Sequence, residues 1–393
     1  MKRVIFWALL FILTGNELVL AQDKKPSLLE PIINDPLLPK LNANRPLTPL
    51  QKEKLKSSLD ELNLQAENLW KSNEQKAAFT LWNREIKLRR FLGLSEEISA
   101  LSRVGKFARD SNDKSEIKLI KERLQSIYDT QAKSELNLEF LQSVATAYQN
   151  LQLPLETLSI YQQIFKLYEA ENNLVKQEET LKIIGDLHIG LLDYEQAALS
   201  YEKLLIFAYN RGDNITHLSY LQQLNYLYEQ SANTDNSLQV KLRLLNDYEQ
   251  QKEQDSKKIL ELQRAIADNY HSLKQPEKAI QYYQDAYKLA MSLEQLSNAS
   301  EILKNMAEIY IEHDNLDYAL QLYQIRVQID QKYNNYYEVM NSYDKIGNIY
   351  RQLKKYELAK EYWQKGLEMA KELKYNEDYF LEQIKQLTMD NEQ

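Results

Sequence analysis

Few residues of this chain are arranged for chemistry. The sequence has 393 residues with four His and no Cys, which excludes thiolate metal sites, a Cys nucleophile and disulfides. Asp268 and His271 are three positions apart, so they would share one face of a helix. Carboxylate ligands of this kind suit Mn²⁺. Two ligands do not make a metal site, so we predict no metal and no other cofactor, with Mn²⁺ at this pair as a weak candidate.

The remaining catalytic signatures do not occur. The sequence contains no phosphate loop, HExxH, GxSxG or EF-hand pattern, and eight Gly leave little room for a phosphate cradle. His188 falls in a helix-packing position, and His217 and His313 fall near expected helix ends. We therefore predict that the protein is not an enzyme. An enzyme stays the rival class, and it would require an acid/base cluster in a pocket.

The composition favours a helical, acidic protein. There are 49 Lys+Arg against 57 Asp+Glu, and the isoelectric point is about 5.4, which argues against nucleic-acid binding because phosphate contacts need clustered basic residues. Hydrophobic residues make up 44% of the chain, enough for a packed core. Gly and Pro number only eight each. This shortage is typical of long helices with short loops rather than of sheets with many turns.

The N-terminal segment divides into two parts. A basic start, a short apolar run and Ala21 indicate a signal peptide over 1–21, because the apolar run is too short to span a bilayer. A proline-rich extended lead follows over 22–47, and we favour its docking on the helical body over a free tether because it carries several Leu and Ile. Thr48, Pro49 and Gln51 form a capping box, which predicts that helix begins there.

A repeat of about 40 residues organises the rest of the chain. In most copies a small residue is followed three positions later by a large one, nine residues on by another small one, and four further by an aromatic, as in Gly347, Tyr350, Ala359 and Trp363. The second and fifth copies are degenerate: Gly105, for example, is followed by Ala108. Small residues allow two helices to approach closely, and the aromatic fills the groove beside them. The first small positions are Ala66, Gly105, Ala145, Gly185, Asn225, Ala267, Ala307 and Gly347.

This pattern resembles the tetratricopeptide repeat. The resemblance implies an all-α fold: a right-handed α-solenoid of about eight antiparallel helix pairs over 48–372, closed by a C-terminal capping helix and tail over 373–393. HEAT-type repeats, with about 40 residues, are the rival architecture, since the tetratricopeptide period is usually 34. We expect the six extra residues to lengthen the second helix of each pair.

The resemblance also implies that the first helices line a peptide-binding groove. The groove residues it implies on later repeats are Lys182, Asp186, Gln222, Tyr226, Arg264, Asp268, His271, Lys304, Glu308, Asp344 and Asn348. The family's carboxylate clamp, which combines Asn with Lys or Arg, does not occur at these positions. Asp186, Asp268 and Glu308 favour a basic or amide-rich peptide. In earlier repeats, Arg103, Lys106 and Arg109 form a small basic patch, and Trp70 is expected to face the groove.

These features together predict an exported, non-enzymatic scaffold. Its partner would be a protein or peptide segment in the groove, with no nucleic acid and no integral membrane anchor, and it would assist assembly of envelope or membrane complexes in the periplasm or an equivalent compartment. The organisation looks like that of cyanobacterial processing-associated tetratricopeptide proteins. That resemblance implies photosystem II biogenesis, binding of the D1 precursor and Mn²⁺ supply. A sensor of peptide signals that uses the same groove is the alternative.

Overall fold

The regular secondary structure of the described residues consists of helices. The computed structural model describes residues 27–30, 32, 34–39, 46–133, 136–251 and 255–390; the predicted signal peptide lies outside them. These ranges contain seventeen helices and no strand, which confirms the all-α prediction. None of the described helices is both long and apolar enough to cross a bilayer.

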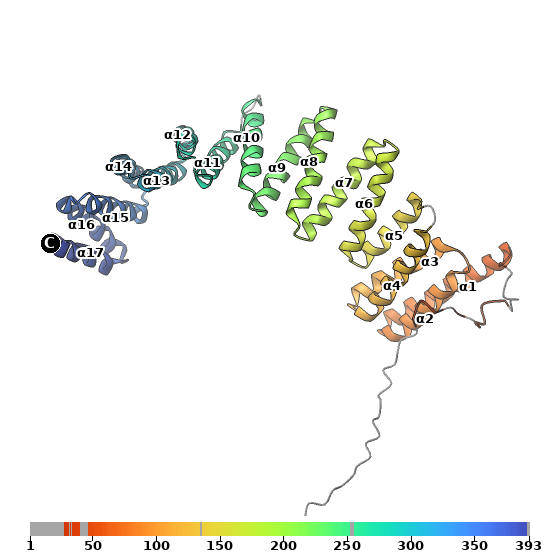
Figure 1. Cartoon of the computed structure of the whole chain (residues 1–393). Helices are drawn as coiled ribbons and strands as arrows, with labels where there is room; N and C mark the ends of the chain where they lie inside the picture. Colours follow the sequence, from red (N-terminus) through yellow and green to blue (C-terminus); the bar gives the residue numbers. More distant parts are fainter. Residues whose placement is uncertain are drawn as a thin grey trace, which may run out of the picture. The chain divides into compact units, whose positions relative to one another are not determined.

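The chain divides into two compact units, residues 1–173 and 174–393. In each unit, consecutive helices pack as neighbours (Figure 1). The helices of the first unit are α1 (Pro49–Lys71), α2 (Gln75–Arg89), α3 (Leu94–Asp110), α4 (Lys114–Gln131), α5 (Leu138–Asn150) and α6 (Pro154–Ala170). Those of the second are α7 (Leu174–Gly190), α8 (Tyr194–Arg211), α9 (Asn214–Gln230), α10 (Thr234–Glu249), α11 (Ser256–Ser272), α12 (Pro276–Ser292), α13 (Leu296–Glu312), α14 (Leu316–Lys332), α15 (Tyr336–Gln352), α16 (Tyr356–Leu373) and α17 (Glu377–Asp390).

The 40-residue period comes from equal helices and equal turns. Helices α11 to α16 begin at residues 256, 276, 296, 316, 336 and 356, a step of 20 residues, and α11 to α15 each have 17 residues. The prediction that the extra residues lengthen only the second helix is therefore wrong. Both helices grow together, because two antiparallel helices pack along their whole length only when they are equally long.

The turns between helices are tight although they contain little Gly. After α11, the backbone N–H groups of residues 273, 274 and 275 bond back to the last carbonyls of the helix at 2.9 Å each. The middle residue of such a turn adopts a left-handed conformation, for example Lys274 with φ 56° and Asn334 with φ 61°. This is a known way to end a helix. Gly212, with φ 70°, is one of two described Gly with a positive φ.

Close packing of a small residue under an aromatic ring joins the two helices of a pair. A Cβ added at Gly347 on α15 would lie 2.7 Å from Trp363 Nε1 on α16, and one added at Gly185 on α7 would lie 2.9 Å from Tyr201 Cε2 on α8. Trp363 is completely buried and Tyr201 nearly so. The predicted pairing of small and aromatic positions thus has a direct steric cause.

The second repeat, whose sequence pattern is degenerate, packs differently. Of the two helices that precede it, α5 packs closely against α3 and only weakly against α4. Gly105 accordingly faces Leu151, just beyond α5, where an added Cβ would lie 3.0 Å from the leucine side chain. Asn150 Nδ2 also donates to Ser102 Oγ on α3 at 2.8 Å. The small residue here allows the approach of a neighbouring repeat rather than of its own partner helix.

The described parts of the proline-rich lead are docked on the first unit. Leu28 is 1% exposed and joins the core formed by α2, α3 and their neighbours. Leu37 and Leu38 pack against a second cluster that contains Leu47. Asp35 accepts two hydrogen bonds from the Arg84 guanidinium, at 2.7 and 2.8 Å. The predicted capping box of Thr48 and Gln51 is also confirmed at the start of α1.

Helix α17 packs on α16 and covers the end of the second unit. Phe380 of α17 is 2% exposed and lies directly over Gly366 of α16, where an added Cβ would be 2.3 Å from its Cε1. The Phe380 ring therefore packs directly on the backbone of α16.

We expect the substitution Gly366→Ala to loosen this contact. The new methyl group would displace the Phe380 ring, at a cost of about 1–3 kcal/mol from overpacking, and the midpoint of thermal unfolding measured by circular dichroism should fall. The control is Gly190→Ala, because a Cβ there meets no atom within 4 Å. Its midpoint should be unchanged or slightly higher; an equal fall in both variants would contradict the steric explanation.

Candidate polypeptide-binding face

All eleven predicted groove residues lie on the first helices of the pairs in the second unit. They are carried by α7, α9, α11, α13 and α15. Lys182, Asp186, Gln222, Tyr226 and Asp268 are exposed. Six are half-buried: Arg264, His271, Lys304, Glu308, Asp344 and Asn348. We call these eleven residues the first-helix face.

Two acidic residues of this face hold the packing tyrosines of the second helices. Tyr201 Oη donates to Asp186 Oδ1 at 2.8 Å, and Tyr283 Oη donates to Asp268 Oδ1. Burial, reinforced by the neighbouring carboxylate, raises the pKa of Tyr201 and of Tyr283, so both hydroxyls keep their protons and act as donors. The sequence analysis assigned these acids to a partner and missed this role. The shared 15-residue spacing from acid to tyrosine could have revealed it.

Where the packing aromatic is Trp, the acceptor moves one turn earlier on the first helix. Trp363 Nε1 donates to Asp344 Oδ1 at 3.0 Å, 19 residues away, and in the first unit Trp82 Nε1 donates to Asn63 Oδ1 at 2.9 Å with the same spacing. The indole N–H and the tyrosine hydroxyl project differently from one backbone position, so each reaches a different acceptor.

Asp344 is also engaged by the capping helix. Its Oδ1 accepts a hydrogen bond from Tyr379 Oη of α17 at 3.0 Å and one from Asn348 Nδ2 at 3.1 Å. Burial raises the pKa of Asp344, and the hydrogen bonds from Tyr379, Trp363 and Asn348 oppose that rise. Asp344 and Asn348 thus serve the closure of the array, which leaves them less available to a partner than the exposed residues of α7, α9 and α11.

Hydrogen bonds and ion pairs connect the neighbouring first helices α11 and α13. Arg264 on α11 donates to Asn298 Oδ1 of α13 at 2.8 Å and lies 3.0 Å from the Glu301 carboxylate. His271 Nε2 lies 2.8 Å from Glu312 Oε2, also on α13. Gln222 on α9 donates instead to Tyr248 Oη of its own second helix at 2.8 Å. These contacts fix the side chains of the face before any partner arrives.

The residues do not fit the weak Mn²⁺ candidate. Asp268 accepts a hydrogen bond from Tyr283 and His271 pairs with Glu312, so the two are committed to different partners. Within the described ranges, no group of three or more His, Asp and Glu is placed to hold a metal ion.

Two expectations for the first unit are corrected. Trp70 does not face a groove: its ring packs against Phe79, Trp82 and Phe107 with centroids 5.2–5.8 Å apart. The basic patch is largely neutralised, because Arg103 donates to both Glu85 oxygens at 2.7 and 2.9 Å and Arg109 bonds its neighbour Asp110. Trp70 and Arg103 thus contact neighbouring helices, whereas Arg109 is paired at the surface.

The family comparison agrees with this architecture. The tetratricopeptide repeat family model matches residues 265–293 and 341–373, which lie in the pairs α11–α12 and α15–α16. These two stretches are tetratricopeptide repeats. A search of curated proteins finds no match.

Solved structures with tetratricopeptide-like folds are similar at low identity. Aspartyl phosphate phosphatase F from Bacillus subtilis is 16% identical, covering 75% of this chain and 78% of that chain, with a TM-score of 0.38. A signal transduction ATPase with a tetratricopeptide repeat sensor, from Pyrococcus horikoshii, is 15% identical with a TM-score of 0.42; the match covers 79% of this chain and 49% of that protein. This chain therefore spans about half the length of the Pyrococcus protein. With TM-scores below 0.5, neither similarity says what this chain binds.

The tyrosine hydroxyls offer a matched test of the acid–tyrosine contacts. Tyr201 donates to Asp186, whereas the buried Tyr323 hydroxyl has no hydrogen-bond partner within the described ranges. Tyr201→Phe should lower the free energy of unfolding by about 1 kcal/mol, and Tyr323→Phe should leave it unchanged or raise it. Denaturant unfolding of both variants measures the difference, and equal losses would refute the structural role of the acid.

Asp344 should make stability depend on pH. Since its pKa is raised in the folded protein, folding favours the protonated form; its contribution is present below the unfolded pKa of 3.8 and is lost as pH rises through the folded pKa. Asp344→Asn keeps an acceptor without the charge, so its melting temperature relative to wild type should increase between pH 3 and pH 7. The exposed Asp317 provides a control substitution to Asn, which should show no such trend.

Proposed function

We propose that this protein is a scaffold that binds a segment of another polypeptide through the first-helix face of its second unit. The observation that supports this is a row of exposed side chains at one repeat position on successive first helices: Asp186 on α7, Tyr226 on α9 and Asp268 on α11. Tyr226 is 43% exposed, and an exposed tyrosine between acidic residues is well suited to contact a peptide.

The acids can bind a partner while they hold the tyrosines. A carboxylate has about four acceptor positions, and the tyrosine hydroxyl uses one of those on Oδ1 in Asp186 and in Asp268. Both carboxylates are exposed and already fixed in orientation, which lowers the ordering cost of binding. Their charge favours a segment rich in Lys or in amide side chains.

The cellular role completes the proposal. The N-terminal sequence pattern supports export to a periplasmic or equivalent compartment, and the lack of a recognised catalytic motif supports a non-enzymatic role in assembling or organising envelope protein complexes. Nothing in the comparisons supports photosystem II, the D1 precursor or Mn²⁺ supply, and that narrower assignment stays a prediction from the sequence.

The test uses charge removal that preserves the internal hydrogen bonds. In the triple variant Asp186→Asn, Asp268→Asn and Glu308→Gln, each residue keeps its acceptor oxygen and loses its charge. Three charge interactions at the protein surface, of about 0.3–1 kcal/mol each, predict at least about fivefold weaker binding of a labelled peptide rich in Lys and Gln, measured by fluorescence anisotropy. A fall in wild-type affinity with added salt should accompany this.

Matched control variants test whether binding depends on the first-helix face or only on the total charge of the protein. Glu195, Glu277 and Asp317 are exposed acids on second helices, and their triple substitution to Gln, Gln and Asn should leave the affinity unchanged. Tyr226→Ala should weaken binding, while Tyr209→Ala on α8, which removes a tyrosine that is 74% exposed, should not. If both triple variants bind like wild type, or both weaken binding equally, the first-helix face is not the binding surface.

A further inference from the structure

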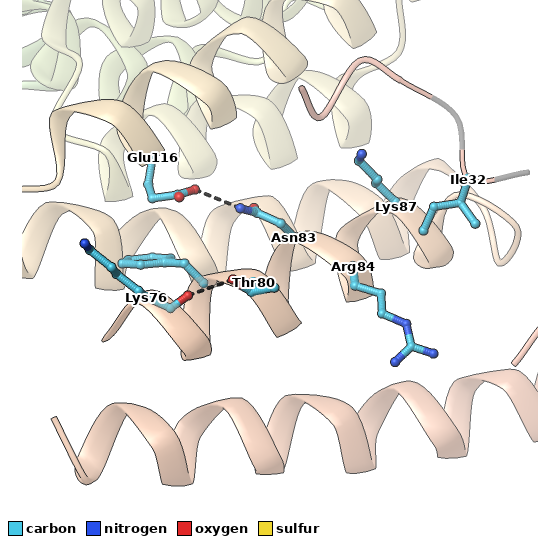
Figure 2. A pocket seen from close by; sticks show the side chains of 8 residues that line it. Ile32, Lys76, Thr80, Asn83, Arg84, Lys87 and Glu116 are labelled. Atoms are coloured by element: carbon cyan, nitrogen blue, oxygen red, sulfur yellow. Dashed lines mark hydrogen bonds between the residues drawn. The ribbon is translucent and has the colours of Figure 1, made fainter. Parts of the chain in front are cut away.

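A separate cavity lies in the first unit, on second helices. It has a volume of about 410 Å³ and is formed by α2, the first turn of α4 and Ile32 of the docked lead (Figure 2). Its lining residues are Ile32, Lys76, Phe79, Thr80, Asn83, Arg84, Lys87 and Glu116. This size is in the range of small-molecule sites.

The walls of the cavity are largely apolar. Hydrocarbon surface comes from Phe79 on α2, which is 3% exposed, and from Ile32 of the docked lead. Lys76 and Lys87 add the methylene stems of their side chains, which pack along apolar surface while the ammonium stays at the end. A ligand with a hydrocarbon portion would therefore be desolvated here.

Two of the charged groups around the cavity are already satisfied. Arg84 extends from α2 in a different direction from Lys87 (Figure 2) and forms the ion pair with Asp35. The carboxylate of Glu116, which is 1% exposed, accepts a hydrogen bond from Asn83 Nδ2 at 3.0 Å.

Lys87 is an unpaired cation at the cavity, where Asn83 Oδ1 also has no hydrogen-bond partner within the described ranges. The Lys87 side chain is 9% exposed, yet it forms no hydrogen bond or ion pair within the described part of the chain. Burial lowers the pKa of Lys87; Glu30 opposes this at longer range and Arg90 adds to it. The hydrocarbon stem of Lys87 is therefore covered, whereas its unpaired ammonium is available to an anionic ligand.

We propose that this cavity binds an apolar carboxylate, with the carboxylate group on the Lys87 ammonium and the hydrocarbon part against Phe79 and Ile32. Lys76, which is exposed at the cavity and likewise has no ion-pair partner among the described residues, adds positive charge. The same chemistry is presented by a fatty acid and by the C-terminal residue of a polypeptide that ends in an apolar side chain. The site is independent of the first-helix face.

The experiment measures binding of defined probes to the full chain by calorimetry. Octanoate represents the fatty acid and N-acetyl-leucine the polypeptide C-terminus; octanol lacks the charge, and inorganic phosphate lacks the hydrocarbon. We expect at least one of the two carboxylates to bind at least about tenfold more tightly than octanol and phosphate, as a charge-assisted hydrogen bond in a desolvated site predicts. The carboxylate that binds more tightly, octanoate or N-acetyl-leucine, shows whether the ligand is a fatty acid or a polypeptide C-terminus. The proposal would be overturned if octanol or phosphate bound as tightly as the better carboxylate, or if neither carboxylate bound.

Lys87→Met tests the residue itself. The variant keeps the hydrocarbon stem and removes the ammonium, so the affinity for the carboxylate should fall at least about tenfold, while the melting temperature without ligand should stay the same or rise. The control is Lys71→Met, at an exposed lysine on α1 outside the cavity, which should bind like wild type. Equal weakening in both variants would indicate general electrostatics, and a lower melting temperature for Lys87→Met would indicate a structural lysine; either result would refute the site.

Discussion

The fold depends on one steric constraint: an aromatic side chain of a second helix packs on a small residue of a first helix, and in the tightest pairs on the bare backbone of a glycine. At Gly347 and Gly185 there is no space for even one additional carbon beneath Trp363 and Tyr201. This contact sets the distance between the two helices and therefore the position of every other side chain along them. It recurs at the capping helix, where Phe380 occupies the equivalent space over Gly366.

The same constraint determines the polar surface. A Tyr or Trp buried in this way carries a donor that is costly to leave without an acceptor, and in all but the Tyr323 pair among those discussed above the acceptor lies on the first helix. Asp186, Asp268 and Asp344 fill that requirement. The acidic character of the first-helix face is thus partly a product of packing, and a partner would meet carboxylates whose orientation folding has already fixed.

The elements of the fold were predictable because their causes are local. Small and aromatic residues at a fixed period indicate paired helices, and Thr48 with Gln51 marks the start of α1. The roles of Asp186 and Asp268 were missed because each acid was considered without the residue 15 positions ahead. The site of Lys87 could not be predicted, because it depends on where the lead docks and on which charges remain unpaired after folding. Trp70 was misplaced for a similar reason: its aromatic neighbours come from two other helices, α2 and α3.

Equal helices separated by equal turns have a consequence for how such a chain can change in length. In a pair such as α15–α16, the odd-numbered helix carries the small residue that lies under the ring and the even-numbered helix carries that ring, so a duplication of 20 residues would break this pairing. Growth by 40 residues preserves the alternation. At α17 the roles are exchanged, because its aromatic residue, Phe380, packs back onto the small residue Gly366 of the even-numbered helix α16.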